Sequence, residues 1–92
     1  MAYNLFIAYD LLPPGQNYDG VCDAIKSLGS YYKFQYSLWY VHTERTPAEA
    51  YAIVSAKMDV WDKLAVINAH DGVVSNWDQP PIEAINAIWH RP

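Results

Sequence analysis

Asp10 is the residue whose position in this sequence most favours chemistry. It ends the apolar segment 6–9, and the chain then bends at Pro13, Pro14 and Gly15. A carboxylate at the carboxyl end of a strand is a common position for a metal or substrate ligand in proteins that combine strands with helices. A carboxylate at a bend can also cap the turn, here by accepting hydrogen bonds from backbone N–H groups of residues 12–16. Asp10 is therefore either a candidate catalytic and metal-binding residue or a turn cap.

Other polar residues lack partners at a spacing that would support catalysis or metal binding. Asp59 and Asp62 are an acidic pair one helical turn apart, which we interpret as an exit turn capped by Asp62. Three histidines have no ligand-spaced partner: His42, His70 and His90.

The segment Gly15-Gln16-Asn17-Tyr18 is the second candidate for binding. It is too short for a phosphate-binding loop and lacks the lysine of one, so its first role is to begin a helix with Asn17 as the N-cap. A cleft around Asp10 and Tyr18 could also hold a small ligand, although the residues identify none. Asn17 and Tyr18 are thus binding candidates.

Hydrophobic patterning predicts the elements that carry these residues. Residues 3–10 are predicted to form a central strand and residues 64–68 another buried strand. Residues 18–28 show helical spacing of apolar residues up to Gly29, which suits a helix end.

The middle of the chain contains a strand region and a second helix. Residues 31–42 are aromatic and β-branched without a turn signal, so they form one long strand or two short ones that meet near residues 35–37. Thr46 begins a capping box with proline at the first helical position, and the buried stripe of this helix is predicted to reach Trp61.

This order of elements predicts an α+β fold, the ferredoxin-like βαββαβ arrangement with two helices on one face of an antiparallel sheet. We expect residues 1–92 to form one domain, with a core of about residues 3–70 and a C-terminal extension over 71–92 whose residues suit a short edge strand and a short terminal helix. The other sheet face would be bare, which favours a homodimer that packs sheet to sheet.

Composition narrows the possible partners and the location. The net charge is −4, and the six basic residues are scattered, so nothing resembles a phosphate-binding stripe and nucleic acid is a poor partner. Cys22 is the single cysteine, which excludes an intrachain disulfide. We interpret it as a small buried hydrophobe. Because no secretory leader or membrane-spanning run is evident, we expect a cytoplasmic protein with no membrane partner.

Several short motifs occur in an order that suggests a family. They are Tyr9-Asp10-Leu11, Pro14-Gly15-x-Asn17-Tyr18, Leu28-Gly29, Ser37-Leu38-Trp39 and Asp59-x-x-Asp62-Lys63-Leu64-x-Val66. The succession resembles the small subunit of the CRISPR adaptation complex, the second Cas protein, and more closely its Cas-two-like or SinR-like branch. The similarity covers about residues 3–68, and its weight comes from order and spacing.

The resemblance implies a ferredoxin-like homodimer in which Asp10 faces its two-fold mate and shares a divalent metal, with Mg²⁺ as the cofactor this would require. It also implies that Tyr36 and Ser37 lie near Asp10, where their hydroxyls could reach a bound phosphate or water. Cross-strand hydrogen bonds are the alternative role for both. On this basis Asp10, with Tyr9 and Ser37, is the catalytic candidate, and Tyr36 joins the binding candidates.

One departure from the family pattern bears on activity, because no lysine or arginine follows Asp10 until Lys26. The leading hypothesis is therefore a non-catalytic or weakly active homodimer that serves as an assembly or interaction subunit in mobile-element or defence biology. Trp39 and Tyr40 are its interface candidates. A further protein is a candidate partner. The alternatives are a metal-dependent endonuclease or phosphodiesterase that uses Asp10 from both protomers, and a small-ligand-binding module.

Overall fold

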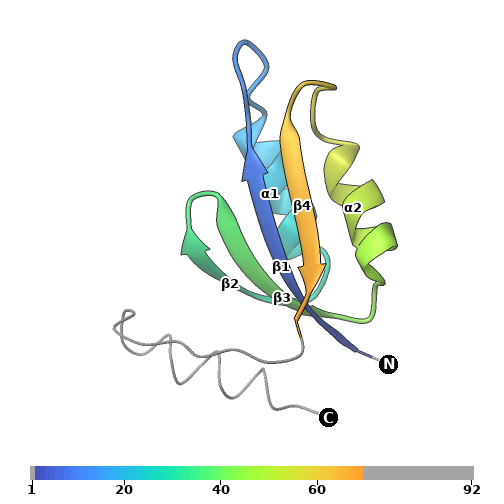
Figure 1. Ribbon diagram of the computed structural model, residues 1–92. Coiled ribbons are helices and arrows are strands. Elements are labelled where there is room, and N and C mark those ends of the chain that lie inside the picture. The colour runs from blue at the N-terminus through green and yellow to red at the C-terminus, as the bar shows by residue number, and fades with distance from the viewer. Residues whose placement is uncertain (1, 70–92) are drawn as a thin grey trace.

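The computed structural model describes residues 2–69. The expected extension over 71–92, with the edge strand and terminal helix predicted for it, lies outside them, as do His70 and His90. The elements are β1 (Tyr3–Asp10), α1 (Tyr18–Lys26), β2 (Ser30–Gln35), β3 (Leu38–Thr43), α2 (Pro47–Ser55) and β4 (Lys63–Asn68). They form one antiparallel sheet of strand order β2-β3-β1-β4, with both helices on one side (Figure 1). The predicted ferredoxin-like α+β fold is confirmed.

The core lies between the sheet and the two helices. Alternate residues of β1 and β3 point toward the helices, because successive side chains of a strand face opposite sides of the sheet. The residues of this core with the least exposure are Leu5, Ile7, Val21, Ile25, Trp39, Val41, Ala50 and Val54. None of the described helices is both long and apolar enough to span a membrane.

Both helices begin where their capping residues predict. The Asn17 side chain accepts a hydrogen bond from the Gly20 N–H at the start of α1. Thr46 and Glu49 form the reciprocal capping box of α2, with Pro47 at the first position. These side chains satisfy N–H groups that have no partner within the helix.

The end of α2 corrects the sequence prediction. The helix stops at Ser55, and the next turn tightens through hydrogen bonds from Lys57 N–H to the Val54 carbonyl and from Met58 N–H to the Ser55 carbonyl. Trp61 therefore lies in the loop before β4, 48% exposed, and the prediction that it continues the buried stripe is wrong.

The strand region over residues 31–42 resolves into two strands. β2 and β3 form a hairpin with a register shift between Lys33 and Gln35, and only Tyr36 and Ser37 separate the strands. The turn is supported from β1: Tyr9 N–H donates to the Ser37 carbonyl at 3.1 Å, and the Tyr9 hydroxyl donates to the Tyr36 carbonyl at 2.5 Å. A tertiary contact thus replaces the glycine or asparagine that a tight turn usually carries.

The sheet surface opposite the helices, here called the open face, carries side chains in register across three strands. Phe6 lies between Tyr40 and Ile67 in one row. Ala8 lies between Leu38 and Ala65 in the next row, and Asp10 lies opposite Lys63 at the end of the sheet.

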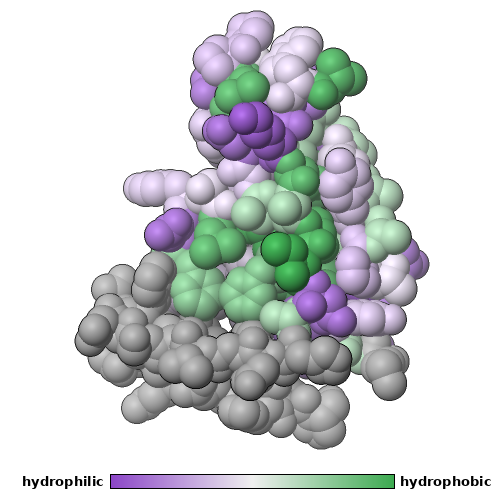
Figure 2. All heavy atoms as spheres, viewed as in Figure 1, coloured by the Kyte–Doolittle hydropathy of each residue, from purple (hydrophilic) through white to green (hydrophobic). Residues whose placement is uncertain are grey.

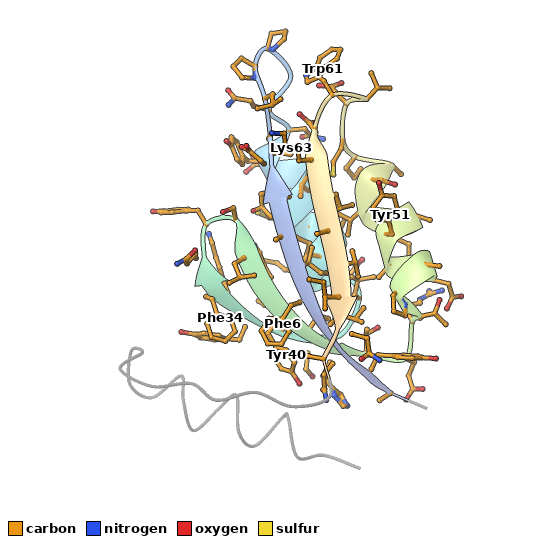
Figure 3. The ribbon with its side chains drawn as sticks, in the orientation of Figure 1. Phe6, Phe34, Tyr40, Tyr51, Trp61 and Lys63 are labelled. Carbon is orange, nitrogen blue, oxygen red and sulfur yellow. The ribbon has the colours of Figure 1, made fainter. Side chains whose placement is uncertain are left out.

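Aromatic rings gather at one end of the open face. The Phe6 ring centroid is 5.4 Å from that of Tyr40 and 5.8 Å from that of Phe34. Figure 3 shows these three side chains together, with Lys63 at the far end of the sheet and Trp61 in the loop beyond it.

Candidate functional site

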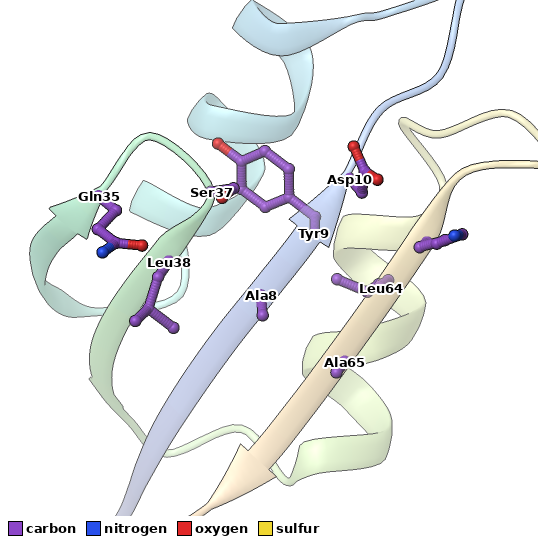
Figure 4. Close-up of a pocket in the computed structure, with 9 residues that line it drawn as sticks. Ala8, Tyr9, Asp10, Gln35, Ser37, Leu38, Leu64 and Ala65 are labelled. Atoms are coloured by element: carbon purple, nitrogen blue, oxygen red, sulfur yellow. The ribbon is translucent and has the colours of Figure 1, made fainter.

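The end of the open face that carries Asp10 is hollowed. The hollow, of about 440 Å³, is a shallow depression over the ends of β1, β3 and β4 (Figure 4). Its lining residues are Ala8, Tyr9, Asp10, Gln35, Ser37, Leu38, Lys63, Leu64 and Ala65. We call it the sheet-face hollow.

The Asp10 carboxylate has no structural role that the described residues reveal. The residue is exposed, and no group in residues 2–69 donates a hydrogen bond to its side chain. Its nearest charged neighbour across the sheet is Lys63, its register partner on β4. The site therefore places one acidic and one basic residue opposite each other on neighbouring strands.

The turn after β1 is capped by Asp62, so the prediction that Asp10 caps it is wrong. Leu12 N–H donates to Asp62 Oδ1 at 2.8 Å, and Asp59 N–H donates to Asp62 Oδ2 at 2.9 Å. One carboxylate thereby holds the loop after β1 and the exit turn of α2 together. The predicted exit-turn role of Asp62 is confirmed, while its bond to Leu12 depends on a contact between loops far apart in sequence.

Further contacts between the same two loops hold the chain beside Asp10. The Trp61 indole N–H donates to the Leu12 carbonyl at 3.4 Å, and Asn17 Nδ2 donates to the Lys57 carbonyl at 3.1 Å. A side chain at Gly15 would place its Cβ 1.7 Å from Asp59 Oδ2, so the glycine permits this close approach. Asn17 thus serves the helix start and the loop contact, and its predicted role in ligand binding stays untested.

Tyr9 lies on the opposite side of the sheet from Asp10, although the two are neighbours in sequence. Its side chain is 5% exposed, and its hydroxyl accepts a hydrogen bond from the Trp39 indole N–H at 3.3 Å and lies 3.5 Å from Cys22 Sγ. Burial, reinforced by the Cys22 contact, raises the pKa of Tyr9 to about 12. The structure does not bring this hydroxyl to the Asp10 carboxylate.

The remaining predicted residues separate into two groups. Ser37 is exposed in the hairpin turn and lines the sheet-face hollow with Asp10. Tyr18 and Tyr36, 47% and 84% exposed, line a different hollow on the helix side of the sheet. The single cleft expected around Asp10 and Tyr18 is therefore two hollows.

The two residues predicted at a dimer interface also lie on opposite faces. Trp39 is 2% exposed and packs in the core under the helices, so a partner on the open face would not touch it. Tyr40 points to the open face, where its hydroxyl donates to Asn4 Oδ1 at 2.6 Å. His42 Nδ1 lies 3.1 Å from the same Asn4 oxygen, which gives this histidine a structural partner.

A metal site is not complete within the described part of one chain. Residues 2–69 hold no cluster of three or more histidine, cysteine, aspartate or glutamate side chains arranged to bind a metal. Asp62 is engaged with backbone N–H groups, which leaves Asp10 as a single free carboxylate in the hollow. A hard cation such as Mg²⁺ takes oxygen ligands and is usually held by one or two carboxylates together with water, so Asp10 would supply only part of its coordination.

Lys63 is the site residue that sequence reasoning missed. The absence of lysine and arginine after Asp10 suggested a site without a base, yet antiparallel pairing of β1 and β4 places Lys63 beside Asp10. The signal was available in principle, since two strands with matched apolar residues pair in a register that aligns their ends.

No family model matches this sequence, and no curated protein matches it either.

Proposed function

We propose that this chain is a homodimeric interaction module of the Cas-two-like type, whose work is assembly rather than catalysis. The observation that carries the proposal is the apolar patch on the open face, made of Ala8, Leu38, Ala65 and Ile67. Ile67 is 57% exposed and Ala65 is exposed, although both belong to a strand of the sheet. Figure 2 shows hydrophobic residues gathered over the middle of this face.

A second copy of the chain is the occupant that the patch suits best. Two sheets pack about 10 Å apart, and the alanines at the centre of the patch allow such an approach. Each Å² of apolar surface buried contributes about 25 cal/mol, which favours covering the patch. Asp10 and Lys63 lie at one end of the patch and carry one charge of each sign. Two copies that face each other would therefore present complementary charges.

The family resemblance supports the same arrangement, because a ferredoxin-like homodimer is what it implies. In this proposal the dimer is a subunit of a larger assembly in mobile-element or defence biology, acts in the cytoplasm, and binds a further protein. The charge of the dimer, twice −4 or −8, disfavours nucleic acid as that partner.

The proposal is tested by the mass in solution at micromolar concentration. Light scattering should give about 21 kDa for the wild type, twice the 10.5 kDa of one chain. Ile67→Lys places a charge in the patch and should give a monomer that keeps its circular dichroism spectrum. Val60→Lys is the matched control, because Val60 is 98% exposed but lies in the loop before β4 and not on the patch.

A wild-type monomer at these concentrations would refute the homodimer. A dimer that survives Ile67→Lys but is lost in Val60→Lys would place the contact at the loops instead.

A second candidate function, a metal-dependent phosphodiesterase, is favoured by the free state of Asp10. A carboxylate that supports no turn and lies on the proposed dimer face could act with its mate from a second copy. A divalent cation held there would supply Lewis acidity and an activated water. In this reading Asp10 would hold the cation, and Lys63 would attract the phosphate.

Calorimetric titration of Mn²⁺ and Mg²⁺, with labelled DNA and RNA in the same samples, separates the two functions. The interaction module predicts neither metal binding nor cleavage in the wild type. Binding and cleavage that both vanish in Asp10→Asn, while the dimer mass stays unchanged, would establish the phosphodiesterase.

A further inference from the structure

A second hollow lies on the helix side of the sheet, between α1 and the β2–β3 hairpin. Its volume is about 450 Å³, within the range of small-molecule sites. The residues that line it are Tyr9, Tyr18, Asp19, Cys22, Lys33 and Tyr36. We call it the hairpin hollow, and it is separate from both Asp10 and the patch on the open face.

Two of its walls are aromatic rings that the fold leaves uncovered. Tyr18 begins α1 and is 47% exposed, and Tyr36 is in the hairpin turn and is 84% exposed. Rings that stay exposed contribute little apolar burial to the stability of the described part of the chain. Flat ligands, by contrast, stack on such rings with a favourable free energy of about 1–3 kcal/mol for a nucleobase.

The hollow also contains a cation, Lys33, that forms no ion pair with the residues that the structure describes. Lys33 Nζ lies 4.5 Å from the centroid of the Tyr36 ring and 5.5 Å from that of Trp39. No carboxylate in residues 2–69 lies within ion-pair distance of this ammonium group. The two rings hold the charge at the hollow without neutralising it.

The floor of the hollow is already satisfied and therefore preformed. The Tyr9 hydroxyl donates to the Tyr36 carbonyl and accepts from the Trp39 indole N–H, and Cys22 Sγ lies 3.5 Å away. These bonds attach the hairpin turn to β1 and α1. A ligand would meet a floor that is already ordered and would not have to order it.

We propose that the hairpin hollow binds a small ligand that combines a flat aromatic ring with one anionic group, as a nucleoside monophosphate does. Lys33 takes the anionic group, and the ring lies against Tyr18 or Tyr36. Asp19, at the rim, accepts hydrogen bonds from ring N–H groups and so favours guanine, which offers two adjacent donors.

Ligand binding can be measured through Cys22, because this residue lines the hollow, is partly exposed, and is the only cysteine of the chain. The rate of its alkylation by iodoacetamide is followed with increasing GMP. We expect saturable protection, with alkylation slowed at least about fivefold, because a bound ring closes access to the thiolate. Guanosine and inorganic phosphate, each carrying half of the ligand, should protect less at equal concentration.

Two lysine variants decide whether the site is the one proposed. Lys33→Gln should weaken GMP protection about tenfold, the loss of one charge-assisted contact. Lys26→Gln is the matched control, because Lys26 also lies over an aromatic ring, 5.9 Å from the centroid of Tyr31, but does not line the hollow. It should leave protection unchanged.

Absence of protection at millimolar GMP, equal protection by phosphate alone, or protection that Lys33→Gln leaves intact would each overturn the inference. The same measurement on Ile67→Lys shows that the result does not depend on the dimer, because the hollow and the patch lie on opposite sides of the sheet.

Discussion

Three aspartates near the end of β1 have different roles because their surroundings differ. Asp62 binds two backbone N–H groups in two loops, and Asp59 packs against Gly15. Asp10 alone is free to meet a partner or a ligand. Asp10, the strongest functional candidate in the sequence, therefore has a carboxylate that can bind a partner or ligand. Asp62, interpreted from the sequence as structural, holds the loops beside it.

Replacing each of the two carboxylates by alanine should separate these roles. Asp62→Ala should lower the free energy of unfolding by about 1–2 kcal/mol, because the Leu12 and Asp59 N–H groups lose their acceptor. Asp10→Ala should change it by less than about 0.5 kcal/mol, as expected for an exposed position. Urea denaturation checks both, and an equal loss in Asp10→Ala would mean that Asp10 supports the fold after all.

Tyr9 should make stability depend on alkaline pH. An unfolded tyrosine loses its proton near pH 10, whereas burial raises the pKa of Tyr9 to about 12 in the folded protein. Between these values the unfolded chain has released a proton that the folded chain still holds. The contribution of Tyr9 is therefore complete below pH 10 and declines as pH rises toward 12.

The measurement is the free energy of unfolding at several pH values from 9 to 12 in wild type and Tyr9→Phe. The variant should be less stable at neutral pH, because the Tyr36 carbonyl loses its donor, and should show a shallower alkaline decline. Tyr51→Phe, at a 48% exposed position, should keep the wild-type slope. A Tyr9→Phe profile parallel to the wild type would contradict the raised pKa.

At the scale of elements, local sequence set where the helices begin, and contacts between elements hold the turns that follow them. Asn17 and Thr46 form cap hydrogen bonds with residues three positions along the chain, so the sequence predicts both caps. The exit turn after α2 is held by Asp62, which also binds the loop after β1. Gly29, after α1, is likewise required by a contact with another element. A Cβ there would lie 2.2 Å from the His42 carbonyl oxygen on β3.

Thr46→Ala should lower the free energy of unfolding by about 1 kcal/mol through loss of the capping box. The same change should raise the pKa of Glu49, which hydrogen bonds from the Thr46 backbone and side chain now hold below its usual value. NMR titration of the Glu49 carboxyl checks the second effect, and Thr46→Ser, which retains the hydroxyl, should preserve both properties. The Thr46 backbone N–H also lowers this pKa and remains in the variant, so an unchanged Glu49 pKa in Thr46→Ala would show that the Thr46 side chain contributes nothing to it.

At the scale of the whole molecule, the two sides of one sheet carry different proposals. The open face, with its apolar patch and its Asp10–Lys63 end, is proposed to meet a second copy. The helix side carries the hairpin hollow with Lys33 and two exposed tyrosines. Because β1 alternates between the two sides, Tyr9 and Asp10 belong to different surfaces despite their adjacency.

A dimer formed through the open face predicts that thermal stability depends on protein concentration. The midpoint of unfolding should rise across a hundredfold increase in concentration, because dimerisation binds only the folded state. Ile67→Lys should remove this dependence and Val60→Lys should keep it. A midpoint independent of concentration in the wild type would argue for a folded monomer.

The order of elements, the helix starts and the central position of β1 follow from the sequence alone, because periodicity and capping act over a few residues. Tertiary structure decided which carboxylate is free, where the chain turns at Tyr36 and Ser37, and which side of the sheet each candidate faces. It also brought Lys63 to Asp10 through strand pairing. Each of these outcomes depends on contacts between residues far apart in the chain, and no local pattern encodes such contacts.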